Sequence, residues 1–429
     1  MGLSLSSEHF AATHEEVYQN VEERASGLAD IGEVLKYFIF ASVGVFFHII
    51  NNKRASFTWM RAWPLLVLLL LAVLSVLWSE IPGVTLRRLI KHLMLMVIVA
   101  GVVIGAGSPR EILRLAVLVT GLMMVLNFAS VLVLPSVAFD GNGLLQGLHG
   151  HKNQAGIFAM ITISVWLSAA RYSSGFWTRS ILYCGTLFWF LFLLGTYSRT
   201  SILCLFASIL FIIPLQYCIK RPTFGVIVAT LTLFISLCVI FILVVLNISF
   251  SDVVDFIEGE RTTLTGRSLV WRIAYNAFLE HQLLGTGFRS LWSTGGLPPV
   301  EQYTDLRPTP FLLGLTQAHS GYLDILATLG IVGAIALSVF LISIIATSIR
   351  ALKWTDKGAD VLQLAELSAF IFFASLIYNL AQSAFLTSNI LWVLIVLCYL
   401  LLCSIGSPTD SESTTDTQSA TTAMPRPRH

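Results

Sequence analysis

The chain has 429 residues, of which 56% are hydrophobic and only 12% are charged. A water-soluble globular protein carries about twice that charged fraction, so the composition excludes a soluble globule and predicts a polytopic membrane protein. The formal net charge of +2 gives no reason to expect a nucleic-acid partner.

About eleven apolar stretches follow one another along the chain, and each is near the roughly 20 residues that cross about 30 Å of hydrocarbon as a helix. Open strand edges could not be satisfied in that environment. We therefore expect an all-α fold with about 11 (10–12) transmembrane helices. The stretches run approximately over residues 31–50, 62–78, 89–107, 112–134, 154–170, 179–195, 200–216, 224–247, 320–349, 361–381 and 385–405.

The distribution of Lys and Arg predicts the topology, because these residues hold short loops on the cytoplasmic side during insertion. Fourteen of the 26 Lys and Arg residues fall in alternate connections and in the C-terminal tail, which we expect to be cytoplasmic. An odd number of spans then places the N-terminal segment outside. That segment shows no basic start followed by an apolar core, so the first span is expected to act as the insertion signal.

The predicted organisation has five parts, and the long outer loop is the largest soluble one. Its segment TGRSLVWRIAYNAFLEHQLLG has apolar residues at helical spacing. This pattern predicts an amphipathic helix lying on the bilayer, with Trp271 in the headgroup region. The five parts are a polar N-terminal segment (1–30), a membrane domain of eight spans (31–247), a periplasmic loop (248–319), a membrane domain of three spans (320–405) and a disordered cytoplasmic tail (406–429).

The remaining twelve Lys and Arg lie on the predicted outer side, where a cation retained against the trend is expected to meet an anion. Arg87 and Arg88 lie near the start of the third span. The Gly-rich segment GLHGHKNQAG then delivers His151, Lys152 and Asn153 to the start of the fifth. An interfacial Arg often only contacts lipid phosphates, and Lys152 and Asn153 could instead cap the helix, so both roles stay open.

Two further arginines are the strongest candidates for binding a phosphate group. Arg199 lies in TYSRTS, between two apolar helices, and Arg267 begins the amphipathic helix of the outer loop. A guanidinium matches phosphate oxygens two at a time and stays charged, and a helix start adds free N–H groups. The two could hold a pyrophosphate and stabilise it as a leaving group. Arg272 and Tyr322 are further candidate substrate-binding residues.

His319 lies in AHSGYLDILATLG, where the ninth span begins. An imidazole can accept a proton from a sugar hydroxyl as that oxygen attacks, so His319 is the candidate general base. The alternative is a hydrogen-bonded structural histidine, which is the commoner role for a lone His near the end of a span. The six cysteines show no metal-ligand spacing, and the acidic run after residue 250 is typical of a solvated face, so we expect no metal and no other cofactor.

Four motifs in this order resemble the O-antigen ligase and Wzy-type polysaccharide polymerase superfamily: GHKNxxG, SRTS, a long loop with GRxxxW and LLGTGF, and HSGYLDILATLGIVG. The likeness spans roughly residues 60–400 and is closest to the exopolysaccharide polymerases of the succinoglycan and xanthan kind. Arg199 and Arg267 match the family's two arginines that hold the pyrophosphate. His319 matches the histidine assigned to acceptor activation, although Ser320 follows it where the family more often has Asn.

The resemblance implies a metal-independent membrane glycosyltransferase at the periplasmic face of the bacterial inner membrane. We expect an exopolysaccharide polymerase that transfers a growing glycan from undecaprenyl pyrophosphate to a lipid-linked repeat unit. Its expected partners are the undecaprenyl-pyrophosphate-linked oligosaccharide, membrane lipids, a chain-length-regulating co-polymerase and a flippase. An O-antigen ligase that delivers the glycan to lipid A core or to a protein is the nearest alternative. A flippase or exporter is disfavoured, because its cations should line a path through the bilayer and the chain shows no internal repeat.

Overall fold

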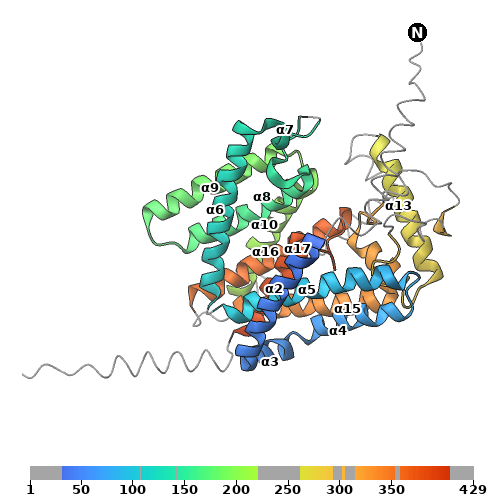
Figure 1. The fold of residues 1–429 in the computed structure, drawn as a ribbon. Helices are drawn as coiled ribbons and strands as arrows, with labels where there is room; N and C mark the ends of the chain where they lie inside the picture. Colours follow the sequence, from blue (N-terminus) through green and yellow to red (C-terminus); the bar gives the residue numbers. More distant parts are fainter. Residues whose placement is uncertain are drawn as a thin grey trace, which may run out of the picture.

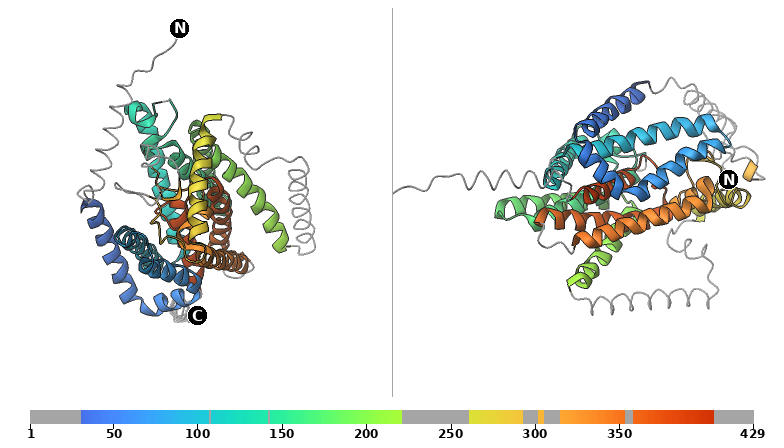
Figure 2. Two further views of the ribbon diagram at one scale, coloured as in Figure 1. Left: turned by 90° about the vertical axis from the view of Figure 1, so that its right-hand side faces the viewer. Right: turned by 90° about the horizontal axis from the view of Figure 1, so that it is seen from below.

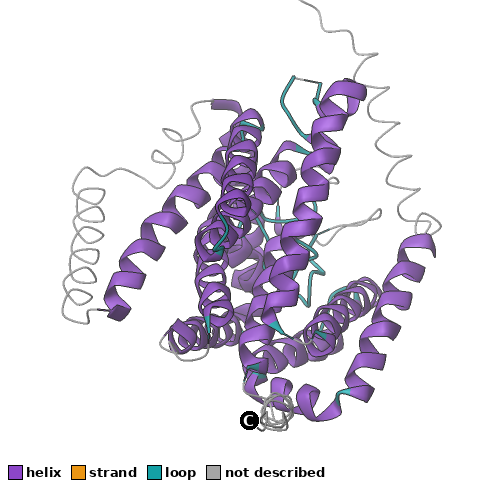
Figure 3. Cartoon of the chain, turned by 90° about the vertical axis from the view of Figure 1, so that its left-hand side faces the viewer, coloured by secondary structure: helices purple, strands orange, loops and turns teal. Residues whose placement is uncertain are grey.

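The computed structural model describes residues 31–106, 108–141, 143–220, 261–292, 302–304, 315–352 and 358–405. Within these ranges the chain is built of helices and short loops and contains no strand (Figure 3). One isolated antiparallel bridge pairs Phe139 with Leu145. The prediction of an all-α fold is confirmed.

Helices occupy the described chain nearly from end to end (Figure 1). In chain order they are α2 (Ile31–Ile50), α3 (Asn52–Arg61), α4 (Trp63–Leu74), η2 (Ser75–Leu77), α5 (Pro82–Gly105), α6 (Pro109–Val133), α7 (Pro135–Ala138), η3 (Gly147–His149), α8 (Lys152–Tyr172), α9 (Phe176–Gly195), α10 (Arg199–Lys220), α13 (Arg261–Glu280), α15 (Gly321–Leu352), α16 (Ala359–Ala381) and α17 (Ile390–Ser404).

Six of the described helices are long and apolar enough to cross a membrane, namely α5, α6, α8, α9, α15 and α16. The pair α2 and α3, bent by 101°, makes up to seven, and three shorter apolar helices cover 63–77, 199–210 and 390–404. The chain is therefore a multi-pass membrane protein. Each predicted span that falls on described residues overlaps one of these helices, but three of them are shorter than a span, so the predicted number of about 11 stays a prediction. The predicted eighth span, the N-terminal segment and the C-terminal tail lie outside the described residues.

Large apolar side chains cover the outward faces of several helices. Leu118 on α6 is 70% exposed, Leu187 on α9 is 57% exposed and Ile342 on α15 is 65% exposed. A soluble monomer rarely presents continuous apolar surface of this kind, whereas lipid tails cover it without loss of hydrogen bonds. The exposed leucines and isoleucines thus agree with a bilayer environment.

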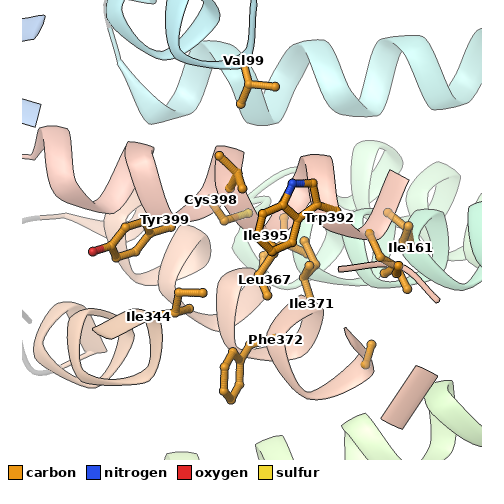
Figure 4. Close-up of a cluster of buried hydrophobic side chains, with 14 of the residues drawn as sticks. Val99, Ile161, Ile344, Leu367, Ile371, Phe372, Trp392, Ile395, Cys398 and Tyr399 are labelled. Atoms are coloured by element: carbon orange, nitrogen blue, oxygen red, sulfur yellow. The ribbon is translucent and has the colours of Figure 1, made fainter. Parts of the chain in front are cut away.

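The core lies around α16 and α17, which pack against α5, α8 and α15. Trp392 and Tyr399 on α17 are each 1% exposed and meet the ring of Phe340 from α15 edge to face. Such edge-to-face pairs add to the apolar burial itself. Figure 4 shows this cluster, in which the labelled side chains are Val99, Ile161, Ile344, Leu367, Ile371, Phe372, Trp392, Ile395, Cys398 and Tyr399.

Helix α13 lies at one end of the bundle and crosses α5 and α15 instead of running along them (Figures 1 and 2). Its apolar face is covered by protein: Val270, Ile273 and Ala277 are buried against Leu315 and Ala318. An amphipathic helix was predicted here and is present. The prediction that its apolar face lies on the bilayer is wrong, because the start of α15 and the segment before it occupy that face.

Helix α15 is broken at Gly330, whose φ of 63° is not helical. A break inside a span leaves backbone N–H and C=O groups that must find other partners. The turn after α13 supplies them on both sides of the break. Thr286 and Gly287 donate from N–H to the carbonyls of Ala327 and Thr328 at 3.0 and 2.9 Å, and Ile331 and Val332 donate to the carbonyls of Gln282 and Leu283 at 2.8 and 3.1 Å.

Two glycines make this close approach possible. A Cβ on Gly285 would lie 2.3 Å from the carbonyl carbon of Thr328, and one on Gly330 would lie 2.4 Å from that of Leu283. Both also have positive φ, which L-residues with a Cβ adopt at a cost. The sequence motifs LLGTGF and ATLG therefore pack closely and hydrogen-bond with each other. We call this contact the interlock, and it fixes the segment that leads into α15.

Candidate active site

His319 stands immediately before α15, with a φ of 51°. Its Nδ1 lies 3.2 Å from Oε1 of Gln382, which follows α16, and 3.4 Å from Nε2 of Gln317. The closer partner is an amide oxygen, which only accepts, so the proton belongs on Nδ1. This arrangement leaves the lone pair on Nε2, the nitrogen that could receive a proton from a substrate.

Asp324, in the first turn of α15, holds the residue before His319. Its Oδ1 accepts hydrogen bonds from the backbone N–H of Ala318 at 2.9 Å and from Nε1 of Trp292 at 2.5 Å. Two donors from separate segments therefore converge on one carboxylate oxygen. Asp324 was not among the predicted site residues, although an acid in the first helical turn, close behind a candidate base, is a signal that the sequence contained.

Asn379 organises the turn that carries Gln382. Its Oδ1 accepts from the backbone N–H of Ala384 at 2.8 Å and of Phe385 at 3.1 Å. A Cβ on Gly321 would lie 1.9 Å from the same oxygen, so the glycine two residues after His319 is required for this packing. Buried polar contacts thus hold the end of α16 against the start of α15, and we call this region the His319 junction.

Tyr322 serves the same junction. Its hydroxyl donates to the carbonyl of Leu376 at 3.0 Å, and its ring meets Phe385 edge to face at 5.5 Å. The hydroxyl is therefore engaged in the packing of α15 on α16. The predicted role of Tyr322 in substrate binding stays a prediction.

The motifs GHKN and SRTS lie next to each other. Lys152 begins α8, and His151 caps it by accepting from the N–H of Asn153 at 3.1 Å. Asn153 in turn accepts through Oδ1 from the hydroxyl of Ser198 at 3.4 Å. Arg199, which was predicted to lie in the connection between two helices, is the first residue of α10. These predicted residues therefore share one end of the neighbouring helices α8 and α10.

Helix α16 connects the GHKN and SRTS motifs to the His319 junction, because it packs against α8, α10 and α15. Tyr378, in its last turn, lies close to Cys204 in the second turn of α10. The end of α16 that presents Gln382 to His319 is thus also the end beside the start of α10. Arg199 and His319 belong to the same end of the bundle.

Arg267 differs from its prediction in one respect. Helix α13 begins at Arg261, so Arg267 lies in its second turn and not at the helix start. The free N–H groups of a helix start therefore do not add to its positive charge. The side chain of Arg267 lies outside the described part of the structure, and its meeting with Arg199 and His319 in one pocket stays a prediction.

Of the other predicted cations, Arg88 is bonded to the protein backbone, whereas Arg87 and Arg272 are exposed. Arg88 is half-buried and donates from its guanidinium to the carbonyls of Arg289 and, at 2.8 Å, of Trp292, so it stabilises the turn after α13. Arg87 is exposed on α5. Arg272 is exposed on α13, where it lines a groove of about 560 Å³ together with Asn276 and Glu280.

A small cleft borders the His319 junction, and one of its residues escaped the sequence prediction. Arg289 lines this cleft, and burial lowers the pKa of its guanidinium while the carboxylate of Asp324 opposes that shift. The sequence signal that could have identified Arg289 is its position directly after the Gly-rich turn LLGTGF. The cleft is also lined by Phe288, Trp292, Thr316, Gln317, Asp324, Ile325, Thr328, Phe385, Leu386 and Thr387.

Residues 184–338 match the family model described as O-Antigen ligase. This segment is therefore similar to the O-antigen ligase family. The chain is also 23% identical over 338 residues to the "Exopolysaccharide production protein ExoQ" of Rhizobium meliloti (strain 1021), a similarity that covers 75% of this chain and 72% of the relative. Both findings confirm the resemblance that the four motifs predicted.

The O-antigen ligase segment contains most of the geometry described above. It includes Arg199, the α13 helix, the interlock of residues 282–287 with α15, and His319 with Asp324. Lys152 and Gln382 lie outside the matched range and reach the site from α8 and from the end of α16. The candidate active site therefore combines the family segment with the helices that surround it.

Proposed function

We propose that this protein is a membrane glycosyltransferase that polymerises lipid-linked repeat units into a secreted polysaccharide. The O-antigen ligase match supports glycan transfer at a membrane, and the similar protein from Rhizobium meliloti is described as an exopolysaccharide production protein. We further propose that the chain lies in the bacterial inner membrane with the His319 end of the bundle facing the periplasm.

In the proposed reaction the donor is a growing glycan on undecaprenyl pyrophosphate. A terminal hydroxyl of a fresh lipid-linked unit attacks the anomeric carbon, and a new C–O bond forms. The bond to the pyrophosphate oxygen breaks, and its electron pair leaves with the pyrophosphate. Nε2 of His319 takes the hydroxyl proton, while Arg199 and Arg267 bind the departing pyrophosphate. Direct displacement inverts the anomeric configuration.

The observation that carries this proposal is the orientation of His319. Gln382 holds Nδ1, and Asp324 fixes the preceding backbone through Ala318. A structural histidine commonly uses both ring nitrogens, whereas the hydrogen bonds of His319 to other described residues engage Nδ1, and its neighbour Gln317 lines a small cleft. This preorganisation is what a general base requires.

A ligase that transfers the glycan to lipid A core is the second candidate, because the matched family model carries that description. It would share the base and the leaving-group site and differ in the acceptor. Either enzyme uses the same donor, so the acceptor distinguishes them.

The test uses the purified full-length chain in lipid nanodiscs with a defined undecaprenyl-pyrophosphate oligosaccharide. A polymerase produces a ladder of multimers from this substrate alone, whereas a ligase produces none until lipid A core is added. We expect His319→Ala to reduce the initial rate by at least about 100-fold. The matched control is Arg110→Gln, an exposed residue at the start of α6. An unchanged ladder from His319→Ala would exclude the proposed mechanism.

A further inference from the structure

Arg289 is a cation held in an unusual way. It directly follows the turn that interlocks with α15, and its φ of 54° is unfavourable for a residue with a Cβ. The backbone carbonyl of Arg289 accepts a hydrogen bond from the guanidinium of Arg88 on α5, which fixes the backbone at this position. The structure therefore determines where the Arg289 side chain starts and which way it leaves the turn.

The guanidinium of Arg289 makes no hydrogen bond and no ion pair with any residue that the structure describes. Asp324 lies near enough to interact with it electrostatically, but its Oδ1 accepts from Ala318 and Trp292 instead. A guanidinium carries five N–H donors, and the partly buried guanidinium of Arg289 keeps them available for an acceptor. The side chain lines a cleft, which is where an acceptor would enter.

The local charge balance also favours an anion. Arg88 lies close enough to Arg289 for the two to repel, and Asp324 is the carboxylate that acts on Arg289. A negative ligand in the cleft would relieve the repulsion between these two guanidinium groups.

The other polar groups of the cleft suit the same ligand. Thr316 offers a hydroxyl donor and Gln317 offers an amide on the walls that Arg289 shares, whereas the hydroxyl of Thr387 already donates to the carbonyl of Ala384 at 2.7 Å. The Gln317 amide also lies 3.4 Å from Nδ1 of His319, so the cleft adjoins the candidate base. A phosphate-type anion takes several hydrogen bonds at once, and this set can supply them.

We infer that Arg289 binds the diphosphate of the lipid-linked donor as it leaves, as a third arginine beside Arg199 and Arg267. The inference rests on the proposed function. In a direct displacement the attacking hydroxyl and the departing oxygen share one anomeric carbon, so the base and the leaving group lie within a few ångströms of that carbon. The cleft beside His319 is thus where negative charge develops on the diphosphate oxygen while the hydroxyl proton passes to Nε2.

The binding test uses the purified full-length chain in phosphatidylcholine nanodiscs, with inorganic pyrophosphate as the probe and isothermal titration as the measurement. We expect Arg289→Gln to raise the Kd for pyrophosphate by about tenfold or more, because one charge-assisted, two-point contact is lost. Arg110→Gln should leave the Kd unchanged. Arg289→Lys keeps the charge but not the planar fork and should fall between the wild type and Arg289→Gln.

Three results would overturn the inference. Arg289→Gln could bind pyrophosphate as the wild type does while its unfolding temperature falls, which would make Arg289 only a counter-charge for Asp324. Should Arg289→Gln not fold, a wild-type Kd in Arg289→Lys would count equally against it. The third result would come from nanodiscs that contain phosphatidylglycerol. If pyrophosphate no longer binds in them, the cleft binds the phosphate of a lipid headgroup instead.

Failure of this inference can be separated from failure of the proposed function. If the wild type forms multimers and Arg289→Gln retains its pyrophosphate affinity, the inference is wrong and the function stands. If pyrophosphate binding depends on Arg289 but no transfer product forms with either acceptor, Arg289 binds a diphosphate and the proposed polymerisation is wrong.

Discussion

The two groups of predicted site residues are held in very different ways. His319 is surrounded by an interlocked set of backbone and side-chain hydrogen bonds that joins α13, α15 and α16 through glycines with no spare room. Lys152, Asn153 and Arg199 stand at the starts of α8 and α10. The two motifs meet there through a hydrogen bond of 3.4 Å between Ser198 and Asn153 and through close packing of Gly156 on Ser198. The candidate base is thus held by more hydrogen bonds than the starts of α8 and α10, which we call the α8–α10 entrance.

The largest effect on stability is expected from a substitution that disrupts the interlock between residues 282–287 and α15. We expect Gly285→Val to destabilise the protein by about 3 kcal/mol or more, because the new side chain would collide with the backbone of Thr328 at a positive φ. Thermal unfolding of the purified chain measures this. The matched control is Gly83→Ala, where nothing lies within 4 Å of an added Cβ. Equal unfolding temperatures for the two variants would contradict the interlock.

A smaller change tests whether Asp324 positions the base. Asp324→Ala leaves the N–H groups of Ala318 and Trp292 without their acceptor, which should cost about 2 kcal/mol of stability and about tenfold in kcat. Asp324→Asn keeps an oxygen that accepts both bonds and should recover most of both losses. Steady-state kinetics with unfolding curves on the two variants provide the comparison. If Asp324→Asn is as slow as Asp324→Ala, the charge and not the hydrogen bond is what matters.

The smallest effect is expected at the α8–α10 entrance. Ser198→Ala removes one long hydrogen bond to Asn153 and should change stability by only about 0.5 kcal/mol. KM for the lipid-linked donor should change by less than threefold, because the backbone of the entrance does not depend on this bond. A loss of kcat as large as that of Asp324→Ala would show that the entrance is as rigid as the His319 junction.

The sequence was a good guide wherever a local pattern carries the information. Apolar stretches predicted the described long apolar helices, and Arg199 lies where two of them, α9 and α10, meet. The prediction was wrong for the apolar face of α13, since periodicity shows that a face is apolar but not whether lipid or protein covers it. Arg267 was predicted at a helix start because the helix was taken to begin later than Arg261.

By itself, then, the sequence determined the membrane class and the all-helical fold and predicted the family resemblance and the candidate base, because composition, periodicity and short motifs are properties of neighbouring residues. Only the tertiary structure decided that LLGTGF pairs with the break at Gly330, that Asp324 and Gln382 orient His319, and that Arg289 faces the adjoining cleft. Apart from the bond between Asp324 and Ala318, these contacts join residues 32 to 63 positions apart. Which donors reach which acceptors therefore depends on how the helices pack.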